Sequence, residues 1–95
     1  MRNLLFILLL GLGFTQSLIE NVTKSYDDGM PKEIKYYKSI SNKIELFTAK
    51  GYYENGQIRY ETKYRDGKKD GKWTSYYYDG QISVELYYKD GVIID

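Results

Sequence analysis

The stretch Tyr52-Tyr-Glu-Asn-Gly-Gln-Ile58 returns almost unchanged as Tyr76-Tyr-Tyr-Asp-Gly-Gln-Ile82, twenty-four residues later. The same offset relates Tyr64-Arg-Asp-Gly67 to Tyr88-Lys-Asp-Gly91. Nine positions match in this one register, and matches so regular do not arise from composition bias. A fixed period of this length is the signature of a repeat protein, in which each unit packs on its neighbour.

Each repeat has the sequence features of a β-hairpin. Asparagine or aspartate precedes glycine at the expected turns, and these dipeptides tolerate the positive φ of a tight hairpin turn. Between the turns, apolar and polar side chains alternate with a period of two, which is typical of strands. The sequence therefore predicts an all-β fold, an antiparallel meander of about six strands. The expected structural turn glycines are Gly29, Gly56, Gly67, Gly71, Gly80 and Gly91.

The alternation also predicts the core and the connections. Most turns should be short, with a longer polar connection at Asp66–Gly71. Glu61 and Glu85 are expected on the solvent face, because their parity is opposite to that of the apolar residues. The expected core face consists of Ile58, Tyr60, Tyr64, Ile82, Val84, Leu86 and Tyr88, joined by Trp73 and Tyr77.

The stretch from Gly67-Lys-Lys-Asp-Gly71-Lys-Trp73 to Ile82 resembles the MORN repeat variant, which occurs in proteins labelled YwqK-family antitoxins. The resemblance covers about Ile44–Gly91, although Ala49 occupies the Trp73 position in the preceding copy. It implies a hairpin-repeat fold and an interaction scaffold. The label attached to similar repeats further implies an antitoxin or immunity-like role.

The repeat pattern divides the chain into a leader at residues 1–17 and a repeat domain at residues 18–95. Within the domain we expect a degenerate repeat at about 28–51, a repeat at 52–75 and a truncated repeat at 76–95. Tracing the twenty-four-residue offset backwards aligns Ile34 with Ile58 and Tyr36 with Tyr60. Terminal repeats often depart from consensus because one side has no neighbour to pack on.

Met1–Ser17 has the composition of a secretory signal peptide. Arg2 gives it a positive start, and an apolar run of eleven residues follows at Leu4–Phe14. This run is shorter than the roughly 20 residues of a membrane-spanning helix. We therefore expect a helical leader that is cleaved after Thr15 or Ser17, and an exported protein that is periplasmic or secreted.

Composition excludes several kinds of site. The chain has no cysteine and no histidine, which removes disulfides, thiol nucleophiles, imidazole bases and the usual zinc ligands. The leader holds one basic residue, Arg2, and no acidic one, so the remaining chain carries thirteen of each. That balance does not suit nucleic acid binding. Glu61 with Glu85, and Asp66 with Asp70, are better explained by ion pairing and turn formation than by catalysis or calcium binding.

We therefore expect a non-enzymatic scaffold with no catalytic, metal or cofactor site, binding another protein through its sheet face or an open edge. Self-association through the open edges of the sheet is a further expectation. The first alternative is binding of carbohydrate or a cell-envelope polymer through exposed tyrosines. The second is binding to a membrane surface, as proposed for the wider MORN group. The candidate binding surface consists of Tyr76, Tyr78, Tyr87 and Tyr52.

Overall fold

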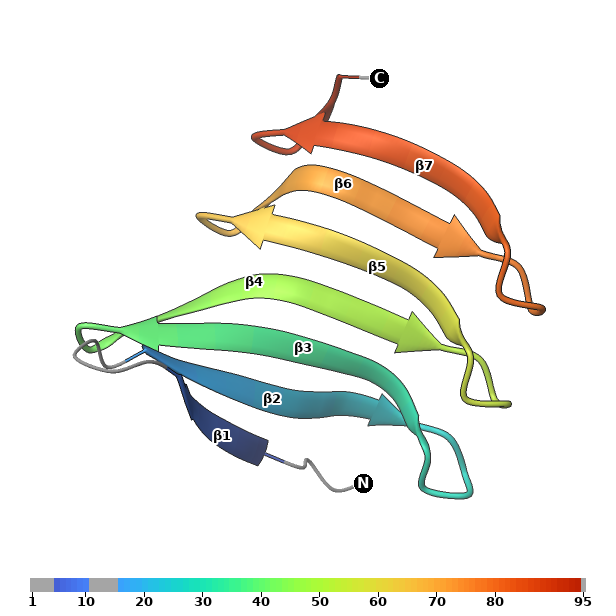
Figure 1. Ribbon diagram of the computed structural model, residues 1–95, viewed down its shortest axis with the longest axis horizontal. Coiled ribbons are helices and arrows are strands. Elements are labelled where there is room, and N and C mark those ends of the chain that lie inside the picture. The colour runs from blue at the N-terminus through green and yellow to red at the C-terminus, as the bar shows by residue number, and fades with distance from the viewer. Residues whose placement is uncertain (1–4, 11–15, 95) are drawn as a thin grey trace.

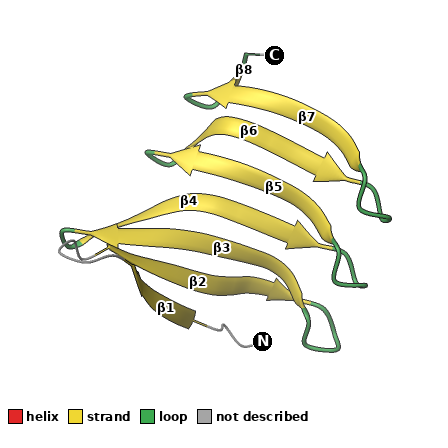
Figure 2. Cartoon of the chain, viewed as in Figure 1, coloured by secondary structure: helices red, strands yellow, loops and turns green. Residues whose placement is uncertain are grey.

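The protein forms one open, curved antiparallel sheet in which each strand pairs with the next along the chain (Figures 1 and 2). This computed structural model describes residues 5–10 and 16–94, and no helix occurs among them. The expected all-β meander is confirmed, with eight strands in the sheet. The strands are β1 (Leu5–Leu10), β2 (Gln16–Ser25), β3 (Pro31–Ile40), β4 (Lys43–Tyr52), β5 (Ile58–Arg65), β6 (Lys68–Tyr76), β7 (Ile82–Lys89) and β8 (Val92–Ile93).

The leader expected at residues 1–17 lies partly outside the described residues, which omit 1–4 and 11–15. Its described part differs from the expected helix, because Leu5–Leu10 pairs with β2 as strand β1. Strand β2 also begins at Gln16, before the domain boundary expected from the sequence. Cleavage and export remain predictions.

Two-residue turns join β3 to β4, β5 to β6 and β7 to β8. Both residues of each turn have positive φ, as in Asp66 (51°) and Gly67 (79°). The longer connection expected at Asp66–Gly71 is therefore wrong, because β6 already begins at Lys68. Gly71 does have positive φ, at 102°, but it lies within β6, where the pairing with β5 is irregular, and not in a turn. The equivalent turns are Ser41-Asn42 and Asp90-Gly91.

Wider loops join β2 to β3, β4 to β5 and β6 to β7. In the second, the Tyr53 amide donates to the Gln57 carbonyl, and the Gly56 amide donates back to the Tyr53 carbonyl. The Asn55 side chain accepts a hydrogen bond from the Gln57 amide at 2.9 Å. Asn55-Gly56 thus belongs to a five-residue loop, Tyr53–Gln57, and not to the tight turn expected. The equivalent loops are Tyr26–Met30 and Tyr77–Gln81, with the same backbone hydrogen bonds.

A β-bulge follows each of these loops, three residues after its glycine. Tyr52 pairs with Ile58 and Gly51 with Tyr60, which leaves Arg59 as the extra residue. Lys32 and Ser83 are the extra residues of the equivalent bulges in β3 and β7. The first two bulges are twenty-seven residues apart, so Glu33 is the counterpart of Tyr60. The alignment of Tyr36 with Tyr60 expected from the sequence is wrong.

These bulges also change which residues share a face of the sheet, so the expected core face is wrong in part. Tyr52 and Gly51 are consecutive, so their partners Ile58 and Tyr60 lie on opposite faces of the sheet. The same argument separates Ile82 from Val84 in β7. A strict alternation through the strand is therefore wrong at its first residues. Beyond the bulge the alternation holds, and Glu61 lies on the face opposite to Tyr60.

The buried centre of the sheet consists of small and medium side chains. No large side chain is fully buried among the described residues, because a single layer covers neither of its faces with another element. The expectation that the seven strand residues supply the core is wrong in this respect, since none of them is buried, and Ile82 is 54% exposed. The buried residues are Val22, Ile34, Ala49, Thr48, Thr62 and Thr74.

Tyrosine hydroxyls link successive hairpins. Tyr26 donates to the backbone carbonyl of Tyr52 at 2.7 Å, and Tyr53 donates to the carbonyl of Tyr76 at the same distance. In each case the first residue of one loop contacts the residue just before the next loop. Tyr77 is the first residue of the third loop, and its side chain is exposed.

Replacing Tyr53 by phenylalanine is expected to lower the free energy of unfolding by about 1 kcal/mol, because the Tyr76 carbonyl loses a partly buried donor. Urea denaturation followed by far-ultraviolet circular dichroism measures the effect. Tyr77→Phe is the matched control and should change stability by less than about 0.5 kcal/mol. Equal destabilisation by the two variants would show that the hydroxyl link contributes nothing.

Candidate binding groove

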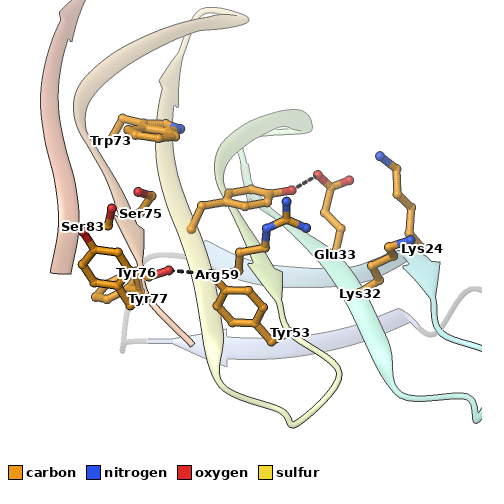
Figure 3. A pocket seen from close by; sticks show the side chains of 11 residues that line it. Lys24, Lys32, Glu33, Tyr53, Arg59, Trp73, Ser75, Tyr76, Tyr77 and Ser83 are labelled. Carbon is orange, nitrogen blue, oxygen red and sulfur yellow. Dashed lines mark hydrogen bonds between the residues drawn. The ribbon is translucent and has the colours of Figure 1, made fainter. Parts of the chain in front are cut away.

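A groove with a volume of about 490 Å³ crosses one face of the sheet from β2 to β7 (Figure 3). This volume is in the range of ligand sites, roughly 300–1,000 Å³. Paired strands place Glu33, Gly51, Tyr60 and Ser75 in one row across the face. We call this side of the sheet the groove face. The lining residues are Lys24, Lys32, Glu33, Tyr53, Arg59, Tyr60, Trp73, Ser75, Tyr76, Tyr77 and Ser83.

The Tyr60 ring occupies the space above Gly51. A Cβ atom at Gly51 would overlap Cε2 and Cζ of that ring, so the absence of a side chain there lets the ring lie against the backbone. The Tyr60 hydroxyl donates to Oε2 of Glu33, and the Thr23 hydroxyl donates to Oε1 at 2.8 Å. Ring and carboxylate therefore hold each other in place between β3 and β5.

Two pKa shifts follow from this arrangement. Partial burial opposes ionisation of Glu33, but hydrogen bonds from Tyr60 and Thr23 and the nearby charge of Lys24 together hold its pKa below 4.5. Burial, and then the hydrogen bond to Glu33 and its charge, raises the pKa of Tyr60 above its ordinary value. At neutral pH the pair is an anionic carboxylate and a neutral phenol.

Replacing Glu33 by glutamine should destabilise the fold at neutral pH and have less effect in acid. A carboxyl group whose pKa is lowered by folding stabilises the protein above its unfolded pKa, and this contribution is lost as pH falls through the folded value. The difference in unfolding free energy between the wild type and Glu33→Gln is thus expected to shrink below about pH 4.5. Urea denaturation at pH 7 and pH 3 measures it. A difference independent of pH would contradict the assignment.

Cations lie over tyrosine rings at two bulges. Lys32 Nζ is 5.2 Å from the centre of the Tyr26 ring, and the Arg59 guanidinium carbon is 5.7 Å from that of Tyr53. The same contact between a bulge residue and a loop tyrosine thus occurs in two hairpins, and both distances are within the cation–π range. In the third hairpin the corresponding residues are Ser83 and Tyr77. Figure 3 shows Ser83, Ser75 and Trp73 on one side of the groove and Glu33, Lys24 and Lys32 on the other.

The groove is locally cationic. Its lining contains three basic side chains and one carboxylate. The ion pairs among the described residues are Lys43–Glu45, Lys63–Glu61 and Lys72–Glu85, and none of them uses a groove cation. The whole chain has a formal charge of only +1, so the groove concentrates positive charge on a nearly neutral protein.

The candidate tyrosines expected from the sequence are divided between the two faces. Tyr78 lies at the rim of the groove with its ring edge-on to Tyr53, the centroids 5.2 Å apart. Tyr76 borders the groove with its backbone carbonyl, and its side chain lies on the opposite face because Tyr76 pairs with Ile82. Tyr87 lies on the opposite face, because its neighbour Leu86 pairs with Trp73 of the groove face. Tyr52, next to Gly51, also lies on that opposite face.

The expected separation of Trp73 and Tyr77 from Tyr76 agrees with the strand pairing. Trp73 and Tyr77 line the groove, whereas Tyr76 pairs with Ile82 and its side chain lies on the opposite face. Tyr76 borders the groove with its backbone carbonyl, which accepts the hydrogen bond from the Tyr53 hydroxyl.

Sequence reasoning missed most of the polar lining. The signal was available, because Lys32, Arg59 and Ser83 each lie three residues after a loop glycine. A bulge inverts the face of the residues on one side of it, and a pattern search with a strict period of two cannot detect that. Glu33 was missed because its true counterpart lies twenty-seven residues away, and not twenty-four.

The carboxylate pairs considered from the sequence have structural contacts. Glu61 and Glu85 both pair with Thr74, one on each side, so a strand separates them. Each also forms an ion pair with a lysine on the face opposite the groove. Asp70 accepts a hydrogen bond from the Asp90 amide at 3.2 Å, next to the last turn. Within residues 5–10 and 16–94 there is no group of three side chains suited to a metal ion.

Comparison with known families gives one match. The MORN repeat variant matches residues 48–66 and 69–90. These two MORN repeat variant stretches include β5, most of β6, and β7, together with the last two bulges. No curated protein and no solved structure matches the chain. No helix of the described residues is long and apolar enough to span a membrane.

Proposed function

We propose that this protein is a non-catalytic binding module that captures another protein through its groove face. The observation that carries the proposal is the groove itself, in which aromatic rings converge on a single sheet face with three cations that form no ion pair among the described residues. Aromatic residues and arginine are the side chains that most often dominate protein interfaces. The pinned Tyr60 and Glu33 make the surface rigid before binding, which lowers the entropic cost of association.

The export signal proposed for residues 1–17 favours a partner in the cell envelope or outside the cell. An antitoxin or immunity-like role, suggested by the label of similar repeats, would then concern an exported toxin. The sheet in this role is a scaffold, and the bulged strands present the binding residues.

Capture experiments with two charge-matched double variants test the proposal. The groove-face variant Lys32→Glu with Arg59→Glu should lose partners that the wild type captures from an envelope extract. Lys50→Glu with Lys63→Glu makes the same charge change on the opposite face, where these residues pair with Glu61 and Thr48. This second variant should still capture the partners. Loss of capture in the second variant alone would refute binding through the groove face.

A second candidate function is binding of a cell-envelope polysaccharide. The specific observation is the exposed aromatic group beside the groove, where Tyr77 is 57% and Tyr78 is 59% exposed. Stacking of sugar rings on such side chains predicts co-sedimentation with isolated envelope polymer, lost in Tyr77→Ala with Tyr78→Ala. Sedimentation that persists in this variant would show that these tyrosines do not bind the polymer. Liposome flotation tests the third possibility, binding to a membrane surface.

A further inference from the structure

The spacing of the bulges indicates what kind of segment fits the groove. Lys32 lies on β3, Arg59 on β5 and Ser83 on β7, each separated from the next by one strand. Neighbouring strands are about 4.8 Å apart, so successive bulge positions are about 9.6 Å apart. The groove therefore carries cations at two of three equally spaced positions across the strands.

A polyproline II helix has the matching repeat. It has three residues per turn and rises about 3.1 Å per residue, so every third side chain points the same way at intervals of about 9.3 Å. An ordinary extended strand alternates its side chains, and residues three apart face opposite sides. Spacing thus favours a polyproline II segment with acidic residues at every third position.

The groove surface also suits this conformation. Aromatic-lined grooves are the usual docking surfaces of proline-rich segments, because the peptide is extended before it binds and loses little entropy. Tyr53, Trp73 and Tyr77 provide such a lining here. Lys32 and Arg59 then select carboxylates on the bound segment, and no ion pair among the described residues occupies them.

We propose that the groove binds an acidic polyproline II segment of the partner protein, lying across the strands with carboxylates three residues apart on Lys32 and Arg59. This inference rests on the proposed function and names the chemistry of its partner. It also makes Ser83 the third position of the same row, at which this chain lacks a cation.

Fluorescence of Trp73 provides the test, because it is the chain's only tryptophan and it lines the groove. The purified protein is titrated with the peptide Glu-Pro-Pro-Glu-Pro-Pro-Glu at low salt. A saturable change is expected, weakening as salt screens the ion pairs. A peptide of the same composition with its glutamates adjacent should bind about fivefold more weakly or worse. Equal binding of the two peptides would overturn the spacing argument.

Three variants sharpen the experiment. Arg59→Gln should weaken binding about fivefold, whereas Lys63→Gln, the same charge change on the opposite face, should leave it unchanged. Ser83→Arg should tighten binding, because the third glutamate then meets a cation. Urea denaturation of each variant separates binding effects from unfolding. No gain from Ser83→Arg, together with no loss from Arg59→Gln, would refute the proposal.

Polygalacturonate, an anionic polysaccharide, serves as the competing ligand. If it changes Trp73 fluorescence and the peptide does not, the ligand is a carbohydrate and the peptide proposal is wrong. If neither binds while Lys32→Glu with Arg59→Glu still abolishes partner capture, the acidic segment is refuted but protein binding through the groove face stands. If neither binds and capture is unaffected, both proposals fail.

Discussion

Replacing Gly51 by alanine is expected to lower the free energy of unfolding by about 2–4 kcal/mol. The new methyl group would occupy the position of the Tyr60 ring, so the ring must move away from the backbone. That movement breaks the hydrogen bond from Tyr60 to Glu33, which joins β3 to β5 across β4. Denaturation in urea measures the loss, and a shift of the midpoint without a change in slope indicates an intact fold.

A double-mutant cycle identifies the cause. Gly51→Ala should cost less in a Tyr60→Ala background, because no ring then competes for the space. Ser75→Ala, on the other side of Tyr60 in the same row, is the control and should have little effect. Additive costs for Gly51→Ala and Tyr60→Ala would show that the close approach of the ring is not responsible.

Replacing Gly56 by valine is expected to cost about 1–2 kcal/mol, although the position is fully open. Nothing lies within 4 Å of a Cβ atom placed there, so steric crowding with other residues does not contribute. The backbone φ of +88° is the cause, because a β-branched residue rarely adopts it. Gly56→Asn is the matched control and should cost less, since asparagine tolerates the left-handed region.

Thermal or urea denaturation of the two variants measures this difference. The same pair of substitutions at Gly80, where φ is +94°, should give a similar result. Equal stability of the valine and asparagine variants would mean that the loop does not need a left-handed residue at this position.

Local signals in the sequence predicted the fold correctly. Dipeptides such as Asp79-Gly80 mark where the chain reverses, and alternation in β5 and β7 marks the strands, so the meander follows from neighbouring residues alone. The type of each turn did not follow. Asp66-Gly67 and Asn55-Gly56 look alike in sequence, but the first forms a two-residue turn and the second lies in a five-residue loop.

The groove could be predicted only in part, because it depends on the bulges. The extra residue Arg59 changes which face Ile58 occupies, and the sequence marks the register shift only by its distance of three residues from the loop glycine. Trp73 and Tyr77 were expected to share one face of the sheet, and both line the groove. Glu33 and Tyr60 are twenty-seven residues apart, and their hydrogen bond appears only when the sheet is assembled.

Mapping of amide chemical shifts by nuclear magnetic resonance tests the central claim most directly, namely that the groove face is the binding surface. The ¹⁵N-labelled protein is titrated with the acidic proline-rich peptide. We expect the largest shifts at Lys32, Arg59 and Trp73, with little change at Lys50 and Lys63 on the opposite face. Shifts centred on the opposite face or on the outer edge of β7, or no shifts at saturating peptide, would contradict the account.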